Sequence, residues 1–155
     1  PAEGPLPILG TVAAYGNNEL GQTDRPITLA AVTTIAAGVW HSLALQEDGR
    51  IIGWGLNADG QTDAPETATE VIALAAGGRH SLALRSTGEV VGWGNNDYGQ
   101  TTVPQLPALA TAIAAGGSHS LALLADGTVA GWGANDSGQI EIPAGLTDVI
   151  AIAAG

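Results

Sequence analysis

A strict 39-residue repeat runs through the chain and limits what it can fold into. Residue types return at this spacing without insertion or deletion, and four periods make 156 positions against a length of 155. The recurring positions include Trp54, Trp93 and Trp132; His41, His80 and His119; and Gln22, Gln61, Gln100 and Gln139. Such a period predicts one unit over 1–155, with repeats about 1–38, 39–77, 78–116 and 117–155, in which each repeat buries its apolar surface against its neighbours.

Each repeat is predicted to form four short strands. Residues 71–77 are an apolar run, 80–84 alternate with a period of two, 89–94 are rich in β-formers, and 100–104 end at a proline, as edge strands often do. Turn signals such as Asp48-Gly49 separate the runs. Four strands and one Trp-Gly pair in roughly 40 residues predict an all-β fold, a β-propeller of four-stranded antiparallel blades.

The composition excludes several classes of function. The chain has 15 acidic residues, four basic residues and a net charge of −11, which disfavours a nucleic-acid partner. It has no cysteine, so disulfides and thiolate metal sites are impossible. No run reaches the roughly 20 apolar residues of a membrane span. We therefore expect no cofactor, no metal, no nucleic-acid partner and no membrane partner.

The two ends of the chain raise the question of how the propeller closes. By phase, Ala2 and Glu3 stand where other repeats have His-Ser, and prolines at positions 5 and 7 degrade the strand that should follow. At the other end, residues 149–155 supply an inner strand, and we expect its members Val149, Ile150, Ile152 and Gly155 to close the ring. One chain could close as four blades, two chains could join head to tail as eight, or the chain could be part of a larger propeller. Because open strand edges favour closure, we favour the two-chain ring, a homodimer formed by strand exchange.

The repeat resembles a known family. The string Ala-Ala-Gly-Gly-x-His-Ser-Leu-Ala-Leu, followed by Gly-x-Val-x-Gly-Trp-Gly-x-Asn-x-x-Gly-Gln, resembles the regulator of chromosome condensation repeat, and the 39-residue spacing is most similar to the bacterial propeller-type β-lactamase inhibitors. The resemblance implies a propeller, usually of seven blades, that binds other proteins. In the inhibitor branch, aromatic residues just before the repeat histidine contribute to binding. The matching positions are Trp40, Arg79 and Ser118, of which only Trp40 is aromatic.

The His-Ser pairs invite a hydrolase interpretation, which we consider weak. A nucleophilic serine needs its base beside it, but neighbours on a strand point to opposite faces. The pair also occurs three times, as a structural feature would. We therefore expect His41, His80 and His119 to bridge strands, and the three histidines to lie too far apart to share a metal ion. Trp54, Trp93 and Trp132 are expected to pack between blades.

The positions that vary between repeats are the better binding candidates, because the fold does not dictate them. We expect Trp40, Arg79, Tyr98 and Ser118 to contact a partner, since aromatic and arginine side chains commonly anchor interfaces. The sequence thus predicts a non-enzymatic protein-binding module with an acidic surface suited to basic partners. The alternatives are a purely structural or engineered self-assembling unit and, less well supported, a propeller enzyme. The N-terminal residues lack the pattern of a signal peptide, so either none existed or it was removed, as in a secreted bacterial protein.

Overall fold

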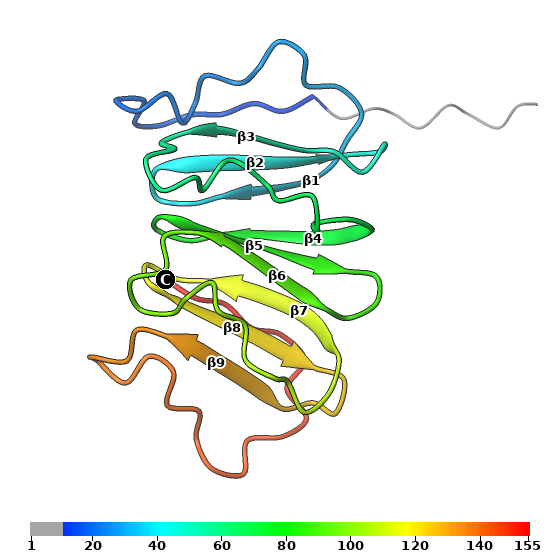
Figure 1. The fold of residues 1–155 in the computed structure, drawn as a ribbon, viewed down its shortest axis with the longest axis vertical. Helices are drawn as coiled ribbons and strands as arrows, with labels where there is room; N and C mark the ends of the chain where they lie inside the picture. The colour runs from blue at the N-terminus through cyan, green and yellow to red at the C-terminus, as the bar shows by residue number, and fades with distance from the viewer. Residues whose placement is uncertain (1–10) are drawn as a thin grey trace, which may run out of the picture.

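Three antiparallel sheets of three strands each lie one after another along the long axis of the molecule (Figure 1). The structure is a computed structural model that describes residues 11–155, so the predictions for positions 2 to 7 lie outside it. The strands are β1 (Val32–Ala37), β2 (His41–Gln46), β3 (Ile51–Gly55), β4 (Val71–Ala76), β5 (His80–Arg85), β6 (Val90–Gly94), β7 (Ala110–Ala115), β8 (His119–Leu124) and β9 (Val129–Gly133). In residues 11–155 no helix is long and apolar enough to cross a membrane.

The first three strands predicted for each complete repeat are confirmed. In the middle sheet, β4, β5 and β6 pair in chain order, and the register sets Ser81 opposite Trp93. The second and third strands of each sheet are joined by a tight turn whose glycine has a positive φ, which residues with a side chain rarely adopt. These turn glycines are Gly49, Gly88 and Gly127. Period-two alternation and turn chemistry therefore specify each sheet locally.

The prediction of a fourth strand in each blade is wrong. The segment after β6, residues 100–104, forms turns instead of pairing with the sheet. Its amides are used locally, because Thr101 N donates to the Asn96 side chain and Thr102 N donates to Gly99 O. The segment nevertheless packs close to β6, since a Cβ on Gly92 would lie 2.8 Å from Thr101 O. The blades thus have three strands and a packed turn rather than four strands.

The predicted count of four blades is also corrected, since the described residues contain three regular sheets. Neither residues 12–16 nor residues 149–155 form a strand. The C-terminal segment instead runs beside the third sheet, where Val149 N donates to Gly127 O and Gly155 O accepts from Gly117 N. A strand needs a paired neighbour, and in residues 11–155 neither segment has one.

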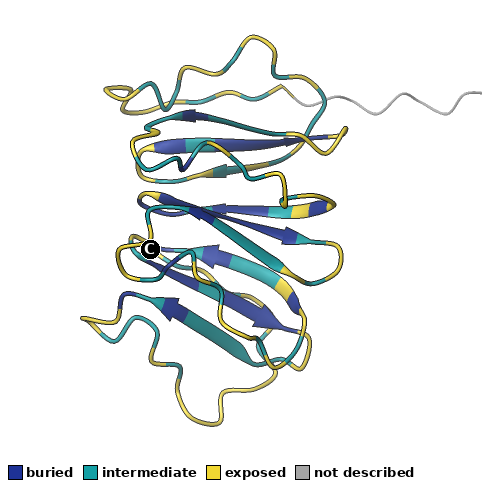
Figure 2. Ribbon diagram, in the orientation of Figure 1, coloured by how far each residue is buried: buried dark blue, intermediate teal, exposed yellow. Residues whose placement is uncertain are grey.

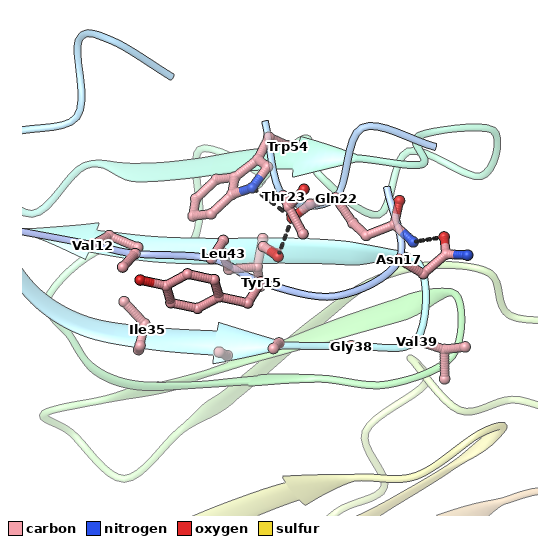
Figure 3. Close-up of a pocket in the computed structure, with 15 residues that line it drawn as sticks. Val12, Tyr15, Asn17, Gln22, Thr23, Ile35, Gly38, Val39, Leu43 and Trp54 are labelled. Carbon is pink, nitrogen blue, oxygen red and sulfur yellow. Dashed lines mark hydrogen bonds between the residues drawn. The ribbon is translucent and has the colours of Figure 1, made fainter. Parts of the chain in front are cut away.

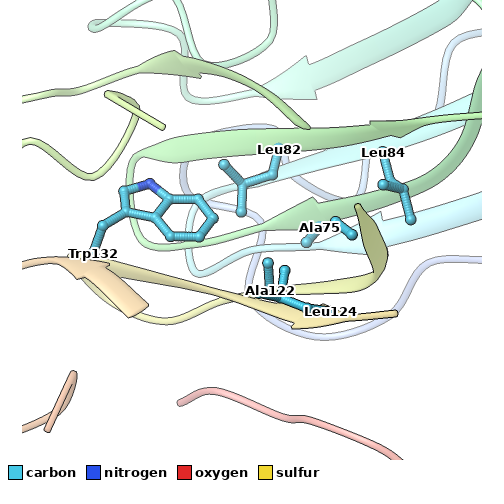
Figure 4. Close-up of a cluster of buried hydrophobic side chains, with 7 residues drawn as sticks. Ala75, Leu82, Leu84, Ala122, Leu124 and Trp132 are labelled. Carbon is cyan, nitrogen blue, oxygen red and sulfur yellow. The ribbon is translucent and has the colours of Figure 1, made fainter. Parts of the chain in front are cut away.

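The core lies between consecutive sheets, where the buried residues concentrate (Figure 2). Between the second and third sheets, Trp132 lies over Leu82, with Leu84, Ala122 and Leu124 beside them (Figure 4). Trp93 occupies the equivalent position against Leu43 and Leu45 of the first sheet. At these two interfaces a tryptophan therefore lies between consecutive sheets.

The first strands of the sheets approach each other closely, which explains the run of small residues. A Cβ on Gly38 would lie 2.3 Å from Gly77 O, and a Cβ on Gly77 would lie 2.4 Å from Gly116 O. Val39 N donates to Gly77 O across this contact. No residue larger than glycine fits at these positions without moving the backbone.

Candidate functional site

A buried polar node joins each sheet to the one before it. The carbonyl oxygen of Gln61, in the loop after β3, accepts hydrogen bonds from Ser81 Oγ at 2.8 Å and Trp93 Nε1 at 2.9 Å. Ser81 Oγ also lies 2.8 Å from His41 Nε2 of the first sheet. The next interface repeats this node with Gln100, Ser120, Trp132 and His80.

The hydrogen bonds of the node fix the protonation of its histidines. Because Ser81 Oγ donates its hydrogen to Gln61 O, it can only accept from His41, so Nε2 carries the proton. Nδ1 of His41 and of His80 has no hydrogen-bond partner among the described residues. Burial lowers the pKa of His41 from 6.5 to about 4, and burial together with the neighbouring His41 and His119 lowers that of His80 to about 4 as well. Both rings are therefore neutral at pH 7.

This geometry makes the histidines structural. Each partners a serine 40 residues away rather than its sequence neighbour, and the serine proton points to a backbone carbonyl instead of the imidazole. A nucleophilic serine would need the opposite arrangement, with its proton on the path to the histidine. Within residues 11–155 there is no group of three or more His, Asp or Glu side chains placed to hold a metal ion.

Side chains of the repeat also hold the loops that follow the third strands. Asn57 Oδ1 accepts from Thr62 N at 3.0 Å, and Asn57 Nδ2 donates to Asp63 Oδ2 at 2.8 Å. Gln61 Oε1 accepts from Asp59 N at 2.9 Å. The asparagine thus holds the loop as an Asx-type turn does. These contacts leave the loop tip as the part free to vary.

The candidate contact residues lie beside these loops. The carbonyl oxygens of Trp40, Arg79 and Ser118 accept from the first residue of the adjacent loop at 2.8 to 2.9 Å. Arg79 Nη1 lies 3.6 Å from Asp59 Oδ2 at the tip of the preceding loop. Here the residue before the repeat histidine lies beside the loop-tip residue 20 positions earlier. The same spacing separates Leu20 from Trp40 and Tyr98 from Ser118 in the sequence.

The side chains of this set differ in exposure. Trp40 is 37% exposed, Leu20 42% and Tyr98 55%, and the Arg79 side chain is also exposed. Ser118 is half-buried. The structure thus places the four predicted contact residues at the same end of their sheets, in consecutive repeats, rather than in one cluster. We call these three pairs, Leu20/Trp40, Asp59/Arg79 and Tyr98/Ser118, the variable row.

The end of the molecule next to β1 carries a feature that the site prediction did not include. A cavity of about 350 Å³ is lined there by Val12, Tyr15, Ile35, Leu43 and Trp54, among others (Figure 3). Tyr15 stands in the tryptophan phase of the repeat, and Ile35 in the phase of Leu74. The sequence signal was the break in the repeat, since Tyr15 alone replaces tryptophan.

The ring-closure candidates lie along the other end of the stack. Ile150 is almost fully exposed, Val149 and Ile152 are half-buried, and Gly155 contacts the third sheet only through its carbonyl oxygen.

Comparisons with known proteins agree with this architecture. Yeast RCC1 (Prp20), in a crystal structure with Kap60, matches 87% of this chain and 42% of its own with a TM-score of 0.71 and 23% identity. Prp20p of Saccharomyces cerevisiae, described with its binding properties to Gsp1p and histones, matches with a TM-score of 0.70 and 23% identity over 87% of this chain and 44% of its own. The ectodomain of the Arabidopsis thaliana receptor kinase ACR4 matches with a TM-score of 0.67 and 20% identity, over 86% of this chain and 47% of its own.

The chain spans less than half the length of these neighbours, and at these identities they show the fold. No curated protein matches it. The Regulator of chromosome condensation (RCC1) repeat, however, matches at residues 32–61, 71–100 and 110–139, which cover the three sheets and more than half of the sequence. The chain belongs to the regulator of chromosome condensation (RCC1) repeat family.

Proposed function

We propose that this chain is a non-enzymatic protein-binding module whose contact surface is the variable row. The observation that carries the proposal is the Arg79–Asp59 ion pair. It joins two positions that vary between repeats, and the His, Asn and Gln residues around them recur with the repeat. Asp59 Oδ1 also accepts from Asn95 Nδ2 at 3.3 Å, so the loops of two repeats meet at this point. The repeated residues fix the backbone, and the side chains of the variable row determine which partner binds.

The chemistry of the row suits a protein surface with an apolar anchor. Leu20 and Trp40 present an apolar pair, Asp59 and Arg79 an ion pair, and Tyr98 a phenol. Trp, Tyr and Arg are the residue types that most often dominate binding energy. The row therefore offers one apolar contact followed by polar contacts.

The charge around the row favours a basic partner. The four loops that follow the third-strand positions, residues 17–25, 56–64, 95–103 and 134–142, carry seven acidic residues and one arginine, Arg25. Potentials of opposite sign across an interface accelerate association and select partners. We therefore propose a partner whose contact segment combines Lys or Arg with an apolar side chain.

The experiment is a selection of displayed peptides on the immobilised chain, followed by titration of the enriched sequences. We expect basic peptides with an apolar residue, and binding that weakens with salt. Trp40→Ala should weaken binding by about thirtyfold, the size of a hot-spot contact. Leu109→Ala is the matched control, because Leu109 is exposed at the opposite end of its strand. Equal affinity of the parent and Trp40→Ala would refute the row as the contact surface.

A second candidate function is self-assembly head to tail into a closed ring. It is favoured by the exposed apolar residues at both ends of the stack, Tyr15 and Ile35 next to β1 and Ile150 next to the third sheet. We propose that residues 149–155 of one copy complete a blade with the N-terminal part of another. Removal of residues 149–155 should then convert a dimer in solution to a monomer, with a mass just below the 15.4 kDa of the full chain. A dimer that survives this truncation would refute strand exchange.

The β-lactamase-inhibitor alternative depends on Trp40 alone, because Arg79 and Ser118 replace the aromatic residues expected before the other histidines. Inhibition of a panel of β-lactamases that is lost in Trp40→Ala would support it. Full enzyme activity at saturating concentrations of the chain would remove it.

A further inference from the structure

The interfaces between the sheets provide a template for the uncovered ends of the stack. In each one, the tryptophan of the later sheet shares a buried cluster with two leucines of the earlier sheet. Trp93 is clustered with Leu43 and Leu45, and Trp132 with the equivalent pair, of which Leu82 lies nearer the ring than Leu84 (Figure 4). The same tryptophan donates its indole N–H to a glutamine carbonyl 32 positions earlier. Each interface therefore joins an aromatic ring to a fixed set of residues on its neighbour.

At the β1 end of the stack, the aromatic half of this template is exposed. Tyr15 stands 39 positions before Trp54, but it is 89% exposed, whereas the three tryptophans of the same phase are 6–8% exposed. Ile35 is 61% exposed, whereas Leu74, its equivalent in the second sheet, is 9% exposed. An apolar surface is therefore left uncovered here by the described residues.

At the other end of the stack, the leucine half of the template is only partly covered. Leu121 and Leu123 follow Leu82 and Leu84 by 39 positions. Leu123 is already buried at 7% exposed, but Leu121 is half-buried, whereas its equivalents Leu43 and Leu82 are completely buried. Gln139, which holds the phase of the carbonyl acceptors, is also half-buried, whereas Gln61 and Gln100 are fully buried. These residues lack the aromatic ring that the template places on them.

We propose that Tyr15 of one copy packs on Leu121 of a second copy, beside the loop of Gln139. This inference rests on the proposed ring and names the contact that forms it. The phases fit, because a second copy placed 156 positions along the repeat puts Tyr15 39 positions after Trp132.

A second copy is the occupant that the geometry favours over closure within one chain. Two sheets separate the segment carrying Tyr15 from β8 of the same chain, and the two lie toward opposite ends of the stack (Figure 1). Contact between the exposed apolar end of one copy and that of a second copy removes both surfaces from water.

The test compares the solution mass of four chains by sedimentation over a wide concentration range. We expect the parent to be a dimer, Tyr15→Ala to raise the dissociation constant about thirtyfold or more, and Tyr15→Trp to keep the dimer. Tyr98→Ala is the matched control, an exposed tyrosine of the variable row whose loss should leave the dimer unchanged. Because Tyr15 is exposed, its replacement does not remove packing from the monomer.

The outcomes separate this contact from the ring itself. A parent that stays monomeric overturns both proposals. A dimer that is equally stable in Tyr15→Ala overturns the Tyr15 contact and leaves the ring to another surface. Open-ended oligomers that depend on Tyr15 support the contact and overturn closure at two copies. A crosslink tests whether the two residues lie close together, because the chain has no cysteine of its own. A short bismaleimide should link Tyr15→Cys chains to Leu121→Cys chains in a mixture of the two. It should not link Tyr98→Cys chains to Leu121→Cys chains.

Discussion

Mild acid should destabilise this protein through its buried histidines. His41 and His80 are fully buried, and burial lowers the pKa of each from 6.5 to about 4. The folded state therefore disfavours the protonated ring, and a second N–H at Nδ1 would find no acceptor among the described residues. As the pH falls below 6.5, His41 and His80 bind protons in the unfolded chain but stay neutral in the folded chain. The contribution of the two neutral histidines to the free energy of unfolding is thus complete above about pH 7 and is lost between pH 6.5 and 4.

The size of the effect follows from the two pKa values. For a group with a pKa of about 4 when folded and 6.5 when unfolded, moving from pH 7.5 to pH 5 costs about 2 kcal/mol. Two such histidines cost about 4 kcal/mol, which is a large part of the 5–15 kcal/mol that typically stabilises a domain. Because most carboxylates titrate below pH 5, this interval isolates the histidines.

The assay is urea unfolding followed by tryptophan fluorescence at several pH values between 7.5 and 5. The buried Trp54, Trp93 and Trp132 report the loss of interblade packing. In the variant His80→Gln, whose amide can still donate to Ser120, we expect lower stability at pH 7.5 but about half the dependence on pH. A parent whose free energy of unfolding is the same at pH 7.5 and pH 5 would refute the reasoning, as would a variant with an unchanged slope.

Two further predictions concern the interfaces between sheets. Gly77→Ala should cost about 3 kcal/mol or more, because its Cβ would lie 2.4 Å from Gly116 O, whereas Gly117→Ala, whose Cβ meets nothing within 4 Å, should be nearly neutral; urea midpoints that match for the two variants would contradict this. Trp93→Phe should cost about 1–3 kcal/mol, because it removes the donor to Gln61 O and part of the ring. An unchanged melting temperature would show that this hydrogen bond and the lost ring volume contribute nothing measurable.

The sheets themselves could be predicted from the sequence because their determinants are local. The alternation in His80–Leu84 and the turn glycine Gly88 specify a hairpin without reference to the rest of the chain. The prediction of a fourth strand at Gln100–Pro104 was wrong for an equally local reason. There the Asn96 side chain and consecutive tight turns use the amides that a strand would need.

The polar node could be predicted only in part. The phased repetition of glutamine, histidine, serine and tryptophan predicts a structural role, and in the structure these residues hydrogen-bond to one another across the interfaces between sheets. Their partners could not be read from the sequence, because His41 bonds to Ser81 rather than to its neighbour Ser42. The contact residues of the variable row remain a prediction, although the Arg79–Asp59 pair supplies a spacing of 20 that the sequence did not reveal.

The sequence by itself determined the repeat, the family, the strands of each sheet and the position of the turns. Period-two patterning and turn residues act over a few neighbouring positions, so they can be read directly from the chain. The tertiary structure was needed to show which repeat supplies the serine for His41 and His80, which loop brings Asp59 beside Arg79, and which apolar residues the ends leave exposed. These depend on the angle and distance at which one sheet packs on the next, and that packing is set by contacts between residues 20 to 40 positions apart.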